Sequence, residues 1–182
     1  MNLPMGYICE KRDEGCKIKE NSPLIFDRYE IIPPKNPETV DFDQARLQCQ
    51  LKGAQWDLAV FNSKNEFSEI QSRIENNCVD DIAYWVGYTE ENEKVLTVSG
   101  DEIFPGSDFY TWKKTGSLNW NRESNPAEPN DKMGNEKCVR MKNGKFNDAM
   151  CFLTHTGARR QMTGMGFICE KHEHNDPGTV IL

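Results

Sequence analysis

Residues 137–151 read Lys137-Cys138-Val139-Arg140-Met141-Lys142-Asn143-Gly144-Lys145-Phe146-Asn147-Asp148-Ala149-Met150-Cys151 and predict a strand that enters a tight hairpin. Asn-Gly between two extended segments is a strong signal for a two-residue turn. The turn leads the chain back to Asn147-Asp148, and a Cys138–Cys151 pair could pin this stretch.

Five side chains between residues 128 and 148 carry oxygen ligands of the kind that calcium prefers. Calcium takes about 6–8 oxygen ligands, and three carboxylates, two amides and the Asp148 carbonyl leave room for water or substrate hydroxyls. Each Glu/Asn pair offers an acceptor and a donor to a sugar diol. We therefore predict a calcium site at Glu128, Asn130, Glu136, Asn147 and Asp148, with sugar hydroxyls bound by Glu128, Asn130, Glu136 and Asn147.

Local signals predict two helices and a buried strand. Asp41 with Gln44 three residues later predicts the start of an amphipathic helix that runs towards Gly53. A second capping pattern at residues 63–66 precedes apolar residues with helical spacing, Phe67, Ile70 and Ile74. Residues 83–88 predict a buried strand, and residues 115–132 predict a loop. We expect Trp85, Trp112, Trp120 and Phe146 to be core residues.

From about residue 26 to residue 171, the chain resembles a C-type lectin domain of the mannose-binding type. The matching landmarks occur in order: Tyr29-Glu30-Ile31, Cys49, Trp85-Val86-Gly87, Asn119-Trp120, Glu128-Pro129-Asn130, Asn147-Asp148 and Gly166-Phe167-Ile168-Cys169-Glu170. The resemblance implies an α+β fold of the C-type lectin-like kind. Two helices flank small antiparallel sheets, and a long calcium-binding loop region is braced by disulfides.

In this family, Glu-Pro-Asn goes with mannose, fucose and N-acetylglucosamine, whereas Gln-Pro-Asp goes with galactose. This chain has Glu128-Pro129-Asn130. The resemblance therefore implies calcium-dependent binding of mannose-type glycans on glycoproteins or cell surfaces. Because a single such site binds one monosaccharide weakly, tandem domains or an oligomer would supply the strength.

The chain departs from the family pattern in two places. Phe146 stands where the family usually has Trp before Asn-Asp, which changes a packing residue and keeps both ligands. Residues 91–110 look long and irregular, and we expect an expanded loop there. The resemblance also implies an auxiliary calcium site, whose candidate ligands are Glu90, Glu91 or Glu93, Asp131 and Glu136.

Seven cysteines indicate disulfides, and disulfides indicate an oxidising compartment, so we expect a secreted protein or the extracellular part of a surface protein. The resemblance implies the pairs Cys49–Cys169 and Cys138–Cys151. Cys9 could pair with Cys16, which would leave Cys78 unpaired or bonded to another chain. The absence of Cys-x-x-Cys argues against zinc, and we expect His172 and His174 to be solvated.

The domain organisation follows from the chain length and one internal repeat. We expect a lectin-like domain at residues 21–171, an N-terminal segment at 1–20 and a polar tail at 172–182. Residues 5–11 (MGYICEK) nearly duplicate residues 165–171 (MGFICEK). The first copy could end a preceding lectin domain, and coincidence in a short apolar segment is the alternative.

Charge and chemistry weigh against other classes of function. A formal net charge of -7 argues against a nucleic-acid partner, and no apolar run approaches the ~18 residues of a membrane span. Carboxylates held on calcium stay ionised, so none can act as a general acid, and we predict no catalysis. The remaining alternative is a lectin-like module that binds protein or another surface, such as ice, and does not read sugar.

Overall fold

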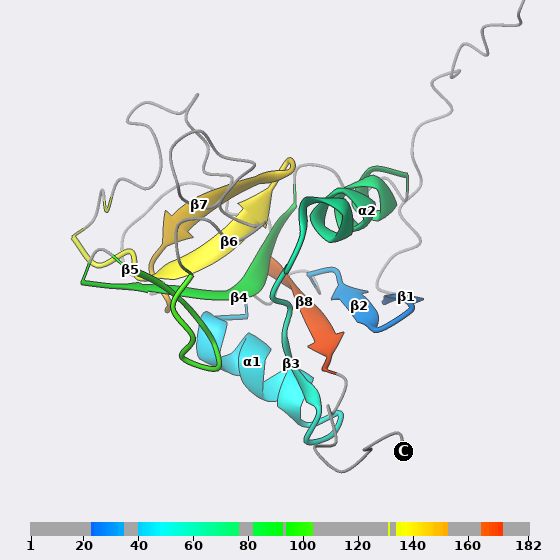
Figure 1. Ribbon diagram of the computed structural model, residues 1–182, viewed down its shortest axis with the longest axis horizontal. Coiled ribbons are helices and arrows are strands. Elements are labelled where there is room, and N and C mark those ends of the chain that lie inside the picture. Colours follow the sequence, from blue (N-terminus) through cyan, green and yellow to red (C-terminus); the bar gives the residue numbers. More distant parts are fainter. Residues whose placement is uncertain are drawn as a thin grey trace, which may run out of the picture.

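Strand β8 (Met165–Lys171) lies at the centre of the sheet, and six of its seven residues are buried. One edge pairs antiparallel with β2 (Tyr29–Ile32). The other edge pairs with β4 (Ala83–Glu91) along its first half and with β3 (Trp56–Leu58) along its second half. In Figure 1, β4 and β8 run through the middle of the molecule, with the two helices and the hairpin β6–β7 around them.

The computed structural model describes residues 23–34, 40–76, 82–92, 94–103, 131, 134–152 and 165–172. The sheet order is β1-β2-β8-β4-β6-β7, with β3 on β8 and β5 on β4. The predicted α+β architecture is confirmed, with two helices beside the sheet. The remaining elements are β1 (Leu24–Phe26), α1 (Phe42–Gln50), α2 (Lys64–Asn76), β5 (Lys94–Thr97), β6 (Cys138–Lys142) and β7 (Lys145–Ala149).

Both predicted helices are present. In α1, Asp41 accepts the Gln44 backbone N–H, and the Gln44 side chain accepts the Asp41 N–H, so the predicted capping box is confirmed. At α2, the Ser63 hydroxyl accepts the Glu66 N–H as predicted, but the Glu66 carboxylate accepts the N–H of Asn62. The three apolar residues that predicted α2 are buried: Phe67, Ile70 and Ile74.

Two predictions about strands have different outcomes. Asn143 and Gly144 have φ values of 49° and 64°, the left-handed pair that a type I′ turn requires, so the hairpin is confirmed. The expectation of an irregular stretch from residue 91 is wrong for its first part. There, β5 pairs with the end of β4, and Leu96 bridges to Glu102. Four residues are a weak local signal, and it is the β4 edge that makes this segment a strand.

The ladders differ from the expected antiparallel pattern in one place. Ala83–Trp85 of β4 run parallel to Met165–Phe167 of β8. The other ladders in the described part of the sheet are antiparallel. A parallel pair needs a long crossover connection, which local sequence patterns do not reveal.

Two disulfides fasten the sheet to its surroundings. Cys49 of α1 bonds to Cys169 of β8, and Cys138 of β6 bonds to Cys151, so both pairings implied by the resemblance are confirmed. Trp85 and Phe146 are fully buried core residues, as predicted. Trp112, Trp120, Cys9, Cys16 and Cys78 lie outside the described residues.

Candidate functional site

The described part of the candidate site is built on β7. Asn147 and Asp148 lie on this strand, 8% and 2% exposed. The Cys138–Cys151 disulfide closes the end of the β6–β7 hairpin, with 5.0 Å between the two Cα atoms. The Cys151 carbonyl accepts the Phe42 N–H at 2.8 Å, which ties the same end to α1. The two candidate ligands therefore lie on a strand that is fixed at its C-terminal end.

Phe146 packs into the core on one face of β7. Its ring contacts the rings of Phe61, Phe67 and Tyr88, with centroid distances of 6.2, 5.3 and 5.8 Å. Successive side chains of a strand point to opposite faces, so a core residue at 146 directs residue 147 away from that core. Phe146 thus fills the packing role predicted for this position.

A hydrogen bond joins β7 to the segment after the Glu-Pro-Asn tripeptide. The Asp131 N–H donates to Oδ2 of Asp148 at 2.6 Å, across 17 residues of sequence. Asn130 is the residue directly before Asp131 in the chain. The carboxylate of Asp148 is therefore fixed to the residue that follows the tripeptide, and consecutive Cα atoms lie only about 3.8 Å apart.

Asp131 also forms hydrogen bonds with the segment that leads to Glu136. Its carbonyl accepts the Gly134 N–H at 2.7 Å, and its Oδ1 accepts the Glu136 N–H at 2.8 Å. The Lys137 ammonium lies 3.3 Å from Oδ2 of Asp131. The Glu136 N–H and the Lys137 charge hold the pKa of the Asp131 carboxyl below its ordinary value of 3.8. Asp131 is thus an ionised residue that links Glu136 to the region of Asp148.

The structure describes three of the five predicted ligands, Glu136, Asn147 and Asp148. Asp131 accepts the Glu136 backbone N–H and donates its own N–H to the Asp148 carboxylate. The Asn147 amide nitrogen lies 3.4 Å from the Lys145 carbonyl, which orients the amide. Glu128 and Asn130 lie outside the described residues.

The auxiliary calcium ligands remain a prediction. The Glu90 N–H donates to the Lys137 carbonyl at 2.8 Å, so the end of β4 lies beside the segment that carries Glu136. The Asp131 carboxylate already interacts with the Lys137 ammonium, which a second cation would have to displace. Glu93 lies outside the described residues.

The donor chemistry of the described ligands fits calcium. Glu136 and Asp148 offer carboxylates and Asn147 offers an amide oxygen, which are hard ligands suited to this ion. Among the residues that the structure describes, no three His, Cys, Asp or Glu side chains form a metal-binding group.

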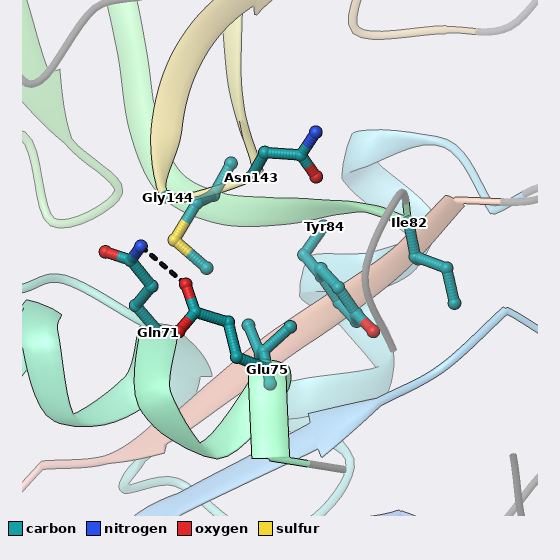
Figure 2. A pocket seen from close by; sticks show the side chains of 8 residues that line it. Gln71, Glu75, Ile82, Tyr84, Asn143 and Gly144 are labelled. Atoms are coloured by element: carbon teal, nitrogen blue, oxygen red, sulfur yellow. Dashed lines mark hydrogen bonds between the residues drawn. The ribbon is translucent and has the colours of Figure 1, made fainter. Parts of the chain in front are cut away.

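A small hollow lies away from the candidate site (Figure 2). It lies where the β6–β7 turn meets α2, and the Gln71 amide donates to Glu75 of the same helix at 2.8 Å. Its free volume of about 20 Å³ has room for roughly one water molecule. It is therefore a packing gap, lined by Gln71, Ile74, Glu75, Ile82, Tyr84, Met141, Asn143 and Gly144.

An ion pair at the candidate site and an ion-pair network elsewhere were not predicted from the sequence. The ion pair joins Lys137 to Asp131 and has no local signature in the sequence. The network joins Arg28 to Glu66 of α2 and to Glu170 of β8, with 3.2 Å between Arg28 Nε and Glu170 Oε1. The only available signal was the acidic residue at the end of the otherwise apolar run 165–169, which is unusual for a buried strand.

Comparison with known proteins identifies the family. The family model for the Lectin C-type domain matches residues 38–156, well over half of the chain. The chain belongs to the C-type lectin domain family. Such domains are typically extracellular and disulfide-bonded, and they are generally non-enzymatic. A search of curated proteins finds no significant match.

Several solved structures share the fold. The mouse scavenger receptor C-type lectin carbohydrate-recognition domain is 20% identical, with a TM-score of 0.54 over 83% of this chain and 96% of that one. Human lithostathine is 16% identical (TM-score 0.52, 83% and 97%). CEL-I from Cucumaria echinata is 11% identical (TM-score 0.53, 81% and 92%). Identities this low establish the fold alone. Neither helix in the described ranges has the length and apolar character needed to cross a membrane.

Proposed function

We propose that this domain binds mannose-type carbohydrate through calcium, with Glu128, Asn130, Glu136, Asn147 and Asp148 as the ligands of the ion. The glycans would be those of glycoproteins or cell surfaces, met by a secreted or surface-exposed protein. These five residues would hold the ion, and bound calcium would supply coordination positions for sugar hydroxyls.

The hydrogen bond between the Asp131 N–H and Asp148 Oδ2 is the main support for this proposal. It joins the residue next to Glu128-Pro129-Asn130 to the carboxylate of Asn147-Asp148, which are the two halves of the proposed ligand set. Asp131 also accepts the Glu136 N–H, so the fifth ligand belongs to the same network. Five residues dispersed over 21 positions of sequence can act together only if such links exist.

The side chains would read the sugar by hydrogen bonding. Glu128 and Glu136 supply acceptors, and Asn130 and Asn147 supply amide donors. A diol whose two hydroxyls are both equatorial, as at the 3- and 4-positions of mannose, would meet one donor and one acceptor at each hydroxyl. Because the carboxylates are ionised when they hold a cation, none is a proton donor, and we propose no catalytic step.

The test is chromatography of the intact chain on immobilised mannose. The chain should be retained in calcium, elute with chelator, and be displaced by mannose or fucose more readily than by galactose. Asp148→Asn should abolish retention, because it removes the charge from a ligand. Glu69→Gln is the matched control, because Glu69 is 60% exposed on α2 and pairs only with Arg73 in the described contacts.

Each outcome separates the proposal from its rival. Retention that persists in chelator, or that free sugar does not displace, would favour a module that binds a protein or another surface. Loss of retention in Glu69→Gln as well would point to unfolding and not to the site, and circular dichroism of both variants distinguishes the two causes.

A further inference from the structure

The closing strand β8 is restricted at nearly every position. Met165, Ile168 and Cys169 are at most 1% exposed, and Cys169 bonds to Cys49 of the first helix. A Cβ at Gly166 would lie 2.5 Å from the Ile32 carbonyl oxygen, so this strand accepts only glycine there. These restrictions come from three neighbouring strands and a helix.

The last buried residue of β8 is an acid. Glu170 is 1% exposed, and its Oε2 accepts the Val60 N–H at 2.9 Å. Its Oε1 lies 3.2 Å from Arg28 Nε. A carboxylate buried at this position requires these partners, because an unpaired buried charge is strongly unfavourable. An acid here is therefore a specific feature of the β8 environment.

Residues 5–11 repeat this set of restricted positions. The glycine, the cysteine and the acid recur in register as Gly6, Cys9 and Glu10, and six of seven residues are identical to those of 165–171. The one difference is Tyr7 in place of Phe167, which conserves the aromatic ring. Residues 5–11 lie outside the described residues, so the comparison with β8 rests on their sequence alone.

We propose that residues 5–11 are a second closing strand of the β8 type, which completes another C-type lectin-like domain N-terminal to this one. The slot in the present domain is already filled by residues 165–171. In the β8 environment, the cysteine bonds to a helix 120 residues away. The natural partner of Cys9 is therefore a first-helix cysteine of the other domain, and not Cys16.

The same chain offers a direct test, because residues 5–11 can reach this domain's own slot. Leu24 pairs with Ile31, and Ile31 pairs with Ile168 of β8, so Leu24 lies two strands away from Ile168. Lys171 is three residues further along β8, which places Leu24 about 14 Å from Lys171 at usual strand spacings. Residues 12–23 connect the two ends, and an extended segment of that length spans roughly 40 Å. If the slot is vacated, the first copy can occupy it.

The experiment vacates the slot in the full chain with Gly166→Val and Cys169→Ser together. The valine would clash with the Ile32 carbonyl, and the serine removes the bond to Cys49. We expect residues 5–11 to replace β8. Peptide mapping without reduction should then find a Cys9–Cys49 disulfide, and the circular dichroism spectrum should remain that of a folded protein. The matched control adds Gly6→Val, which should lower the yield of this disulfide at least tenfold.

The result that would overturn the proposal is a double variant that lacks the Cys9–Cys49 bond and is as unfolded as the control. A Cys9–Cys49 bond that forms equally well with Gly6→Val would overturn it too, because bonding would then not depend on the strand. A bond between two chains, seen as a disulfide-linked dimer that Gly6→Val abolishes, would support it. In that case, a second copy of this domain provides the slot.

Discussion

The two disulfides between described residues close loops of very different length, and their removal should affect stability and calcium binding in opposite order. Cys49–Cys169 spans 120 residues and Cys138–Cys151 spans 13. By loop entropy, the longer bond contributes about 5 kcal/mol to stability and the shorter about 3 kcal/mol. Cys49→Ala/Cys169→Ala should therefore destabilise the fold more than Cys138→Ala/Cys151→Ala.

Calcium affinity should respond in the reverse order. The shorter bond closes the hairpin that carries Asn147 and Asp148, whereas the longer one joins α1 to β8. If about half of the bracing free energy of the shorter bond, roughly 1.4 kcal/mol, must be recovered on binding, affinity falls about tenfold. Removal of the longer bond should change calcium affinity by less than about twofold at a temperature where the protein stays folded.

The assay combines urea unfolding in chelator with calorimetric titration of calcium, both on the two double variants and the wild type. Circular dichroism before titration confirms that each sample is folded. The reasoning is refuted if loss of Cys49–Cys169 weakens calcium binding more than loss of Cys138–Cys151. The site would then depend on global stability and not on the hairpin brace.

Three further predictions test other parts of the account. Burial raises the pKa of Glu170 from 4.5 to about 7, so its contribution to stability falls by roughly 3 kcal/mol as pH rises through that window. In urea unfolding with chelator, Glu170→Gln should make the free energy of unfolding less dependent on pH. If the stability of the wild type rises relative to that of the variant as pH increases, the prediction is contradicted. Gly87→Ala should cost about 1–3 kcal/mol by the same method, because its Cβ would lie 2.5 Å from the Leu58 carbonyl; an unchanged midpoint would be inconsistent with that contact. Glu128→Gln with Asn130→Asp should make galactose a better competitor than mannose on the mannose column, and an unchanged order would separate this tripeptide from sugar choice.

The sequence predicted features that depend on neighbouring residues. The Asp41–Gln44 capping box and the Asn143-Gly144 turn are recognisable because each is formed by residues within a few positions. The resemblance supplied what local patterns could not, including both disulfides. Phe146 was correctly placed in the core because a large aromatic side chain seldom has another role in a strand.

Features that depend on distant segments were not predictable. Lys94–Thr97 is a strand because it pairs with the edge of β4, which is not visible in its four residues. The hydrogen bond from the Asp131 N–H to Asp148 uses a backbone donor, and backbone donors leave no trace in the amino-acid types. The same holds for Glu170, which is buried only because Arg28 and Val60 come from other parts of the chain.

The most direct test of the central claim is a calorimetric titration of mannose into the intact chain, once with calcium and once with excess chelator. The account predicts weak, saturable binding with calcium and none in chelator. Equal binding in both conditions, or none in either with the protein shown to be folded, would contradict a calcium-dependent sugar site.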